Sequence, residues 1–273
     1  IRLGAPPHPC LAIVTHDADR PQILVDDQPL HLFQDNGVHA DQTPGEVYIY
    51  VGEKQASGNT VEKAGLVGGD VYGIKVAGPV QNEALGTLIP TVSTTFTLAA
   101  LGDVSDLTGT QIDTASAAAG VTDFLRPEDG AWDPANPNVL YFLTTGNGGY
   151  GSRLIRLTFD DIADPALGGT VDVLVDGLVD PVVSLDNMTV SDSGIIFMQE
   201  DPGSSAHLAR LWAYDPATDT LQEVAEHNAA LFGLGAAEFL TTNEESSGII
   251  DVTDIIGDGD TQAFLLDVQA HYN

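Results

Sequence analysis

The sequence has 273 residues, of which 43% are hydrophobic, enough for a sizeable core. Its 40 Asp and Glu face only 9 Lys and Arg, and the net charge of −31 argues against nucleic acid and anionic membranes as partners. No run approaches the roughly 18 apolar residues of a membrane span, so no membrane insertion is expected. The self-repulsion of such a surface can be screened by salt or neutralised by bound cations.

Short strand-like runs separated by turn residues dominate the sequence and predict an all-β fold. In chain order, the runs rich in β-branched and aromatic residues are 47–51, 71–76, 91–98, 139–144, 154–159, 171–175, 195–199, 211–214, 221–224 and 264–268. Helices are expected at two places, the Ala-rich segment 112–119 and the segment 228–234.

An internal repeat in the second half of the chain indicates a β-propeller. The run of strands at 139–175 corresponds to the run at 194–224, with a repeat of about 55 residues, close to the size of a kelch-type blade. At roughly 40–50 residues per blade, the chain would supply five or six blades. We therefore expect a single β-propeller domain over residues 1–273, with an irregular N-terminal part at 1–42. A sandwich or another open all-β stack is the alternative.

The most distinctive candidate site is the segment 124–134, Phe-Leu-Arg-Pro-Glu-Asp-Gly-Ala-Trp-Asp-Pro. Pro127 is expected to prevent regular strand pairing, so that Arg126, Glu128 and Asp129 lie on an irregular loop. Adjacent carboxylates suit a hard cation, and the neighbouring Arg suits an anionic group held by that cation. A structural Arg–carboxylate pair is the alternative interpretation.

Three further places combine acidic and amide side chains near strand ends. Asp186-Asn187 is a common pair of calcium donors, although an Asp-Asn turn is equally common. Glu200-Asp201 ends a predicted strand, and Glu244-Glu245 precedes one. Each pair alone could be a solvated loop, but pairs at corresponding blade positions favour a shared metal site at one mouth of the propeller.

Other kinds of site are not favoured by the sequence. Cys10 is the one cysteine, so neither an internal disulfide nor a Cys-rich zinc site can form. The seven His show no zinc spacing, and neither a Gly-x-Ser-x-Gly elbow nor a P-loop is present. The chain starts at Ile1 without a visible signal peptide, which indicates a processed product.

The same segments resemble the PhoX-type alkaline phosphatases and their phytase-like relatives, a family of secreted bacterial propeller proteins. The likeness covers roughly residues 43–272 and rests on several motifs in order: 43–52, 62–66, 124–134, 186–187, 200–203 and 244–251. It implies a secreted or periplasmic hydrolase that uses calcium and iron at the propeller mouth to bind a small phosphate ester. The family's iron-binding Cys-Glu-Glu segment has no counterpart in this chain.

The resemblance also implies roles for individual residues. Glu128 is expected to be a metal ligand and, with Arg126, a catalytic residue, Arg126 giving support that faces the phosphate. The remaining expected metal ligands, or residues that support them, are Asp129, Asp186, Asn187, Glu200, Asp201 and Glu244.

Two functions follow as hypotheses. The first is a metal-dependent phosphomonoesterase in which Glu128 and Glu200 hold the cations. The second, favoured by the missing Cys-Glu-Glu segment, is a non-catalytic, calcium-stabilised extracellular propeller used for binding or as a scaffold. A carbohydrate or lactone hydrolase is a lesser option, permitted by the paired carboxylates but favoured by nothing specific.

Overall fold

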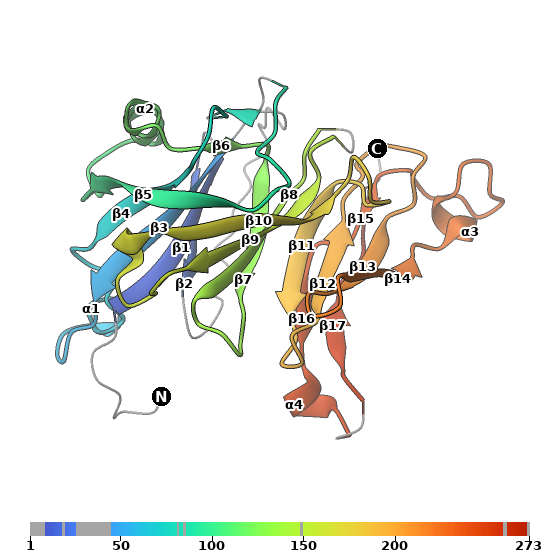
Figure 1. The fold of residues 1–273 in the computed structure, drawn as a ribbon. Helices are drawn as coiled ribbons and strands as arrows, with labels where there is room; N and C mark the ends of the chain where they lie inside the picture. Colours follow the sequence, from blue (N-terminus) through green and yellow to red (C-terminus); the bar gives the residue numbers. More distant parts are fainter. Residues whose placement is uncertain are drawn as a thin grey trace. The chain divides into compact units, whose positions relative to one another are not determined.

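The computed structural model describes residues 9–17, 20–25, 45–80, 82–83, 86–147, 150–258 and 261–271. The chain forms two compact units (Figure 1). The first unit comprises Ile1–Pro127 and Thr158–Val171, and the second comprises Glu128–Leu157 and Asp172–Asn273. Strands predominate in both, which confirms the prediction of an all-β fold.

The first unit is built on strands in the hydrogen-bonded order β2-β1-β3-β4-β5, with β6 paired to β3. The first residues of β10, Gly169–Val171, pair antiparallel with β5. The elements of this unit are β1 (Pro9–Asp17), β2 (Arg20–Val25), β3 (Gly45–Glu53), α1 (Thr60–Lys63), β4 (Asp70–Val76), β5 (Thr94–Gly102), α2 (Gly109–Ala119), β6 (Asp123–Phe124) and η2 (Pro165–Leu167).

The N-terminal segment is more regular than the sequence predicts. Within 1–42, β1 pairs antiparallel with both β2 and β3, so the expectation of an irregular segment is wrong for these two strands. The rest of 1–42 lies outside the described residues. Pro21 and the polar residues of β2 are not typical of a strand in the middle of a sheet. However, β2 is the last strand in its sheet order, and such a strand tolerates a missing N–H and polar residues.

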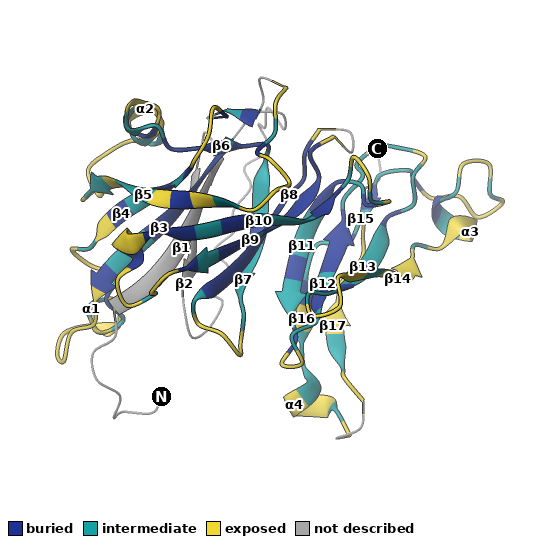
Figure 2. Cartoon of the chain, viewed as in Figure 1, coloured by how far each residue is buried: buried dark blue, intermediate teal, exposed yellow. Residues whose placement is uncertain are grey.

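The core of the first unit forms around β3, whose residues Val47, Tyr48 and Ile49 are almost completely buried (Figure 2). Tyr48 also bonds the hydroxyl of Ser116 over 2.7 Å, which fixes α2 against β3. Val and Ile side chains pack well on a pleated, buried surface, so this apolar run forms a central strand.

In the second unit, β10-β9-β8-β7 are the last four strands in the order of a ten-stranded sheet, and β11-β12-β13-β14 form a sheet of their own. Two antiparallel pairs of short strands, β15–β18 and β16–β17, complete it. The elements are β7 (Pro127–Trp132), β8 (Val139–Thr144), β9 (Arg153–Phe159), β10 (Gly169–Asp176), β11 (Leu185–Val190), β12 (Ile196–Glu200), β13 (Arg210–Asp215), β14 (Thr220–Glu226), α3 (Ala229–Phe232), β15 (Glu244–Glu245), β16 (Ile249–Asp251), α4 (Thr253–Ile256), β17 (Phe264–Leu266) and β18 (Gln269–Ala270).

These two sets of four strands correspond to the repeat seen in the sequence. Each connects four consecutive strands as neighbours, which is the arrangement of a propeller blade. One apolar core contains side chains from both sheets, among them Tyr141, Leu154, Met188, Met198 and Trp212. The number of blades and the single-domain organisation stay predictions.

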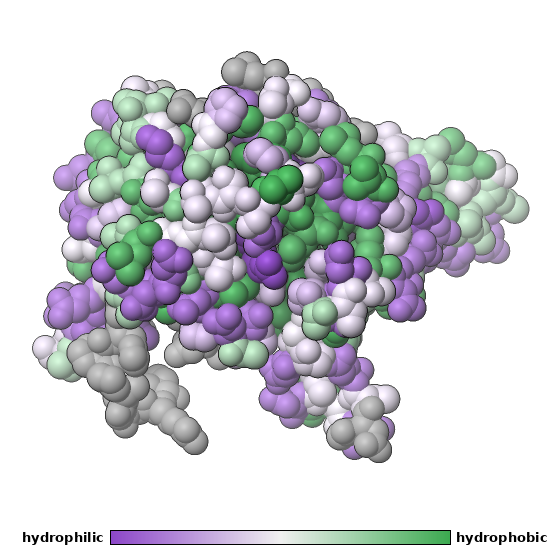
Figure 3. Space-filling view, in the orientation of Figure 1, coloured by the Kyte–Doolittle hydropathy of each residue, from purple (hydrophilic) through white to green (hydrophobic). Residues whose placement is uncertain are grey.

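The predicted elements agree well with the observed ones. All ten predicted strand runs overlap a strand, and both predicted helices form, as α2 and α3. No helix in the described part of the chain is both long enough and apolar enough to cross a membrane. Figure 3 shows hydrophilic residues spread over the face in view, as the acidic composition leads one to expect.

Candidate functional site

A β-bulge at the start of β11 presents Asp186. Leu185 pairs with Glu200 and Asn187 pairs with Gln199, so Asp186 is an extra residue in the β11–β12 ladder. Such bulges redirect side chains and are common beside active sites. The sequence left open a turn at Asp186-Asn187, whereas the structure has a bulged strand.

The backbone before the bulge is also unusual. Ser184 has a φ of 51°, in the left-handed region, and its carbonyl accepts a hydrogen bond from the Asp201 N–H over 2.8 Å. A buried non-glycine residue in this region costs on the order of 1–3 kcal/mol. The strained turn holds Asp201, just after β12, against the beginning of β11.

Glu128 and Asp129 lie on strand β7, not on an irregular loop, so that prediction is wrong. Pro127 is the first residue of the strand, a position at which a missing N–H does not interrupt the ladder. The Asp129 carboxylate accepts from the Met188 N–H over 3.0 Å and from the Gly130 N–H over 2.8 Å. Asp129 therefore fixes β7 to β11 beside the bulge.

Four other carboxylates act electrostatically on Asp186. Burial raises the pKa of Asp186 well above its usual range, and the negative charges of Glu128, Asp201, Glu245 and Asp129 raise it further. All five belong to the second unit. We call these five residues the Asp186 cluster. It concentrates negative charge where a cation would be stabilised.

Glu245 is held in the cluster by its own contacts on β15. Its Oε1 accepts from the Ser247 hydroxyl over 2.6 Å and from Gln269 Nε2 over 3.1 Å, and its Oε2 lies 3.4 Å from His271 Nε2. Sequence reasoning selected the neighbouring Glu244 instead. Successive side chains of a strand alternate between its two faces, which separates Glu244 from Glu245 on β15.

The donor atoms of the cluster suit a hard cation. They are carboxylate oxygens, and the buried amide oxygen of Asn187, next to Asp186, has no hydrogen-bond partner in the described structure. Calcium takes six to eight oxygen ligands of these kinds. Among the described residues, however, no three His, Cys, Asp or Glu side chains are already arranged to hold a metal ion. The residues present thus fit calcium chemically, but the carboxylates alone do not form a finished set of ligands.

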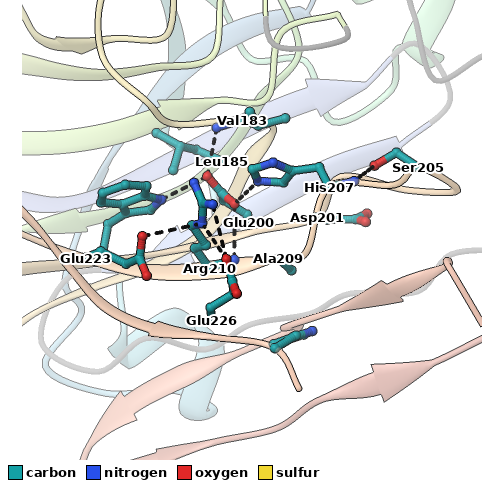
Figure 4. Close-up of polar contacts among 12 residues, drawn as sticks. Val183, Leu185, Glu200, Asp201, Ser205, His207, Ala209, Arg210, Glu223 and Glu226 are labelled. Atoms are coloured by element: carbon teal, nitrogen blue, oxygen red, sulfur yellow. Dashed lines mark hydrogen bonds and ion pairs between the residues drawn. The ribbon is translucent and has the colours of Figure 1, made fainter. Parts of the chain in front are cut away.

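Glu200 lies outside the cluster as the centre of a separate network (Figure 4). Its buried carboxylate accepts from the backbone N–H groups of Val183 (2.8 Å) and Arg210 (3.1 Å) and from Trp212 Nε1 (2.8 Å). The fourth contact is His207 Nε2, 2.7 Å away. A carboxylate has about four acceptor positions, and here protein groups contact all of them. Glu200 therefore joins the segment before β11, strand β13 and the loop after β12.

Glu244 occupies a second separate environment. It is 1% exposed, its Oε1 accepts from the Ala209 N–H over 3.3 Å, and His227 Nδ1 lies 3.9 Å from the same oxygen. Burial raises the pKa of Glu244, whereas burial lowers the pKa of His227. Glu244 is not among the charges that shift Asp186.

The structure thus divides the predicted site residues into groups. Glu128, Asp129 and Asp201 act on the pKa of Asp186, and Asn187 follows Asp186 in the chain, whereas Glu200 and Glu244 lie in separate contact networks. Arg126 has a φ of 59° and belongs to the first unit. The roles of all these residues as ligands or catalysts stay predictions.

Comparison with solved structures finds a similar fold. A structure described as "Pseudomonas fluorescens PhoX in complex with vanadate, a transition state analogue" matches with a TM-score of 0.54 and 16% sequence identity, over 89% of this chain and 46% of that chain. No protein-family model matches the sequence. No curated protein matches it either.

The match confirms that the fold is all-β and PhoX-like, of the propeller type predicted from the sequence. At this identity it shows the fold alone. The chain spans about half the length of the PhoX chain that it matches.

Proposed function

We propose that this chain carries part of the metal site of a phosphatase-like hydrolase that acts on small phosphate monoesters. The observation that carries the proposal is the Asp186 cluster, in which four neighbouring carboxylates and burial together raise the pKa of one carboxyl group. The fold similarity to PhoX, whose structure contains vanadate as a transition-state analogue, supports the phosphate ester as substrate.

The negative charge of the Asp186 cluster would make binding of a phosphate monoester depend on a metal ion. A phosphate monoester is itself an anion, and five carboxylates in one place would repel it. A cation must therefore neutralise the cluster before substrate can approach. Asp186, Glu128 and Asp201 would hold calcium, while Asp129 keeps β7 in place through Met188. When bound, the cation would polarise phosphoryl oxygens and lower the pKa of a water molecule.

Two residues named from the sequence take different parts in this proposal. Glu200, whose acceptor positions are in use, positions the loop that carries Asp201 and is not itself a ligand. A phosphate-facing role for Arg126 rests on the resemblance alone. Iron as a second metal and a secreted location remain part of the proposal through the resemblance alone.

The test is hydrolysis of p-nitrophenyl phosphate by protein first stripped with a chelator and then supplied with calcium, iron or both. We expect turnover that depends on added metal and is lost in Asp186→Asn. Asp192→Asn, at an exposed turn position, is the matched control and should retain activity. Absence of turnover in the fully metallated protein would refute the enzymatic function.

A non-catalytic, calcium-stabilised propeller is the second candidate. It is favoured because the sequence lacks the Cys-Glu-Glu segment with which the resembled family binds iron. Under this alternative, calcium raises the melting temperature although no phosphate ester is hydrolysed. An unchanged melting curve after exhaustive chelation would count against it.

A further inference from the structure

Asn187 and Gln199 face each other across strands β11 and β12. They are register partners in the antiparallel ladder, immediately beside the bulge at Asp186. Side chains of directly opposed residues lie on the same face of a sheet, about 5 Å apart at Cβ. Both carry an amide oxygen, and both oxygens are buried without a hydrogen-bond partner in the described structure.

Two unpartnered amide oxygens at one place require an explanation. Gln199 is only 1% exposed, so bulk solvent does not reach its oxygen. A buried acceptor without a partner is costly, and nearly all such groups in folded proteins find one. Two such oxygens side by side suit a ligand that accepts electron pairs from oxygen.

The face on which these oxygens lie can be identified from their neighbours. Met188 and Met198, the next register pair, pack in the apolar core. Successive side chains of a strand alternate between faces, so Gln199 lies on the face opposite Met198. Phe197 shares that face and contacts Phe264 of β17, with ring centroids 4.3 Å apart. The two amides thus point away from the core, toward the hairpins that cover this side.

We propose that the Gln199 and Asn187 side-chain carbonyls are ligands of the same hard cation as Asp186, with calcium as the metal. The inference rests on the metal site of the proposed function and adds Gln199 to it. Calcium needs six to eight oxygens, and five carboxylates alone would overcompensate its two positive charges. Neutral amide oxygens supply ligands without adding charge, and they complete a set that the carboxylates do not form on their own.

The experiment compares Gln199→Met with wild type by calcium titration and thermal unfolding, each after removal of metal. Met retains a similar shape but has no oxygen donor. We expect calcium affinity to fall at least about tenfold, the scale of loss seen even for residues that only support metal ligands. In a chelator, the melting temperature should stay the same or rise, because an unpartnered buried oxygen has been removed. In calcium, it should fall below that of wild type.

Two further variants sharpen the result. Gln199→Glu restores an oxygen and should recover calcium binding, whereas Gln222→Met, at an exposed position of β14 in the same sheet, should change neither quantity. If the amides hold only a buried water molecule, Gln199→Met will alter stability equally with and without calcium, and the proposal is overturned. Unchanged calcium affinity in Gln199→Met overturns it as well.

The experiments test the assignment of Gln199 as a ligand independently of the proposed enzymatic function. Calcium binding that depends on Gln199 in a protein that hydrolyses no phosphate ester upholds the ligand assignment and rejects the enzyme. Metal-dependent hydrolysis together with unchanged calcium affinity in Gln199→Met does the reverse.

Discussion

The indole N–H of Trp212 donates to the buried carboxylate of Glu200 over 2.8 Å, linking the centre of β13 to the end of β12. Trp212 also belongs to the apolar core of the second unit. The bond therefore ties that core to the loop that begins with Asp201, a member of the Asp186 cluster. Packing on one face of the sheet thus helps to place a carboxylate of the candidate site.

Replacing Glu200 by Gln should destabilise the protein strongly. The amide offers only one acceptor oxygen, so at least one of the four groups that contact the carboxylate loses its buried partner. We expect the free energy of unfolding to fall by roughly 3 kcal/mol, as for hydrogen bonds to a buried charged group. Urea denaturation measures it. Glu226→Gln, which disrupts an exposed pair with Arg210, should cost less than about 1 kcal/mol.

Gly130 is expected to tolerate no side chain. A Cβ at this position would lie 2.8 Å from the Tyr141 carbonyl oxygen and 3.1 Å from Phe142 Cβ, so β7 would have to move away from β8. Gly130→Ala should reduce stability by about 1–3 kcal/mol and weaken calcium binding through Glu128 and Asp129. In Gly248→Ala the nearest atom is at an ordinary 3.5 Å, and thermal melts should show little change.

Glu46 of β3 should make the first unit sensitive to pH. Burial, followed by the charges of Asp123 and Asp113, raises the pKa of Glu46 to about 7. Between the normal pKa of about 4.5 and 7, the folded protein keeps a proton that the unfolded chain releases, so stability falls as the pH rises. Glu46→Gln should remove this dependence and be more stable than wild type at pH 8. Equal pH profiles for the two proteins would contradict the assignment.

Asp186 should also make the stability of the metal-free protein fall as the pH rises. Its raised pKa means that deprotonation in the folded state is unfavourable, so stability is highest below the unfolded pKa of about 3.9 and falls as the pH rises. In a chelator at neutral pH, Asp186→Asn should therefore be more stable than wild type, and at about pH 4 the difference should vanish. A destabilised Asp186→Asn under these conditions would show that the carboxylate is not repelled by its neighbours.

Strands and helices could be predicted from the sequence where their formation depends mainly on their own residues. The β-branched run around Ile49 forms a central strand, and the Ala-rich segment before Gly120 forms α2, which ends at that glycine in the left-handed conformation. The strands β1 and β2 were missed because β1 pairs with β3, which begins more than twenty residues after β1 ends, and β2 pairs only with β1 among the described strands. Pro127 was misread because its effect depends on whether it starts a strand or lies within one.

The candidate site was predictable as a set of acidic pairs but not residue by residue. At β7 both Glu128 and Asp129 act on Asp186, whereas each of the other two acidic pairs contributes one member. Asp201 and Glu245 are in the cluster, whereas their neighbours Glu200 and Glu244 have other partners. Gln199 carries no signal in the sequence, since a glutamine at a strand end becomes informative only when its oxygen is buried without a partner.

The most direct test of the central claim is a calcium titration of metal-free protein, followed by calorimetry, for wild type, Asp186→Asn and the control Asp192→Asn. If the Asp186 cluster is a cation site, wild type and the control bind calcium with equal affinity and Asp186→Asn binds at least about tenfold more weakly. Calcium binding that is absent from wild type, or that is unchanged in Asp186→Asn, would contradict the account.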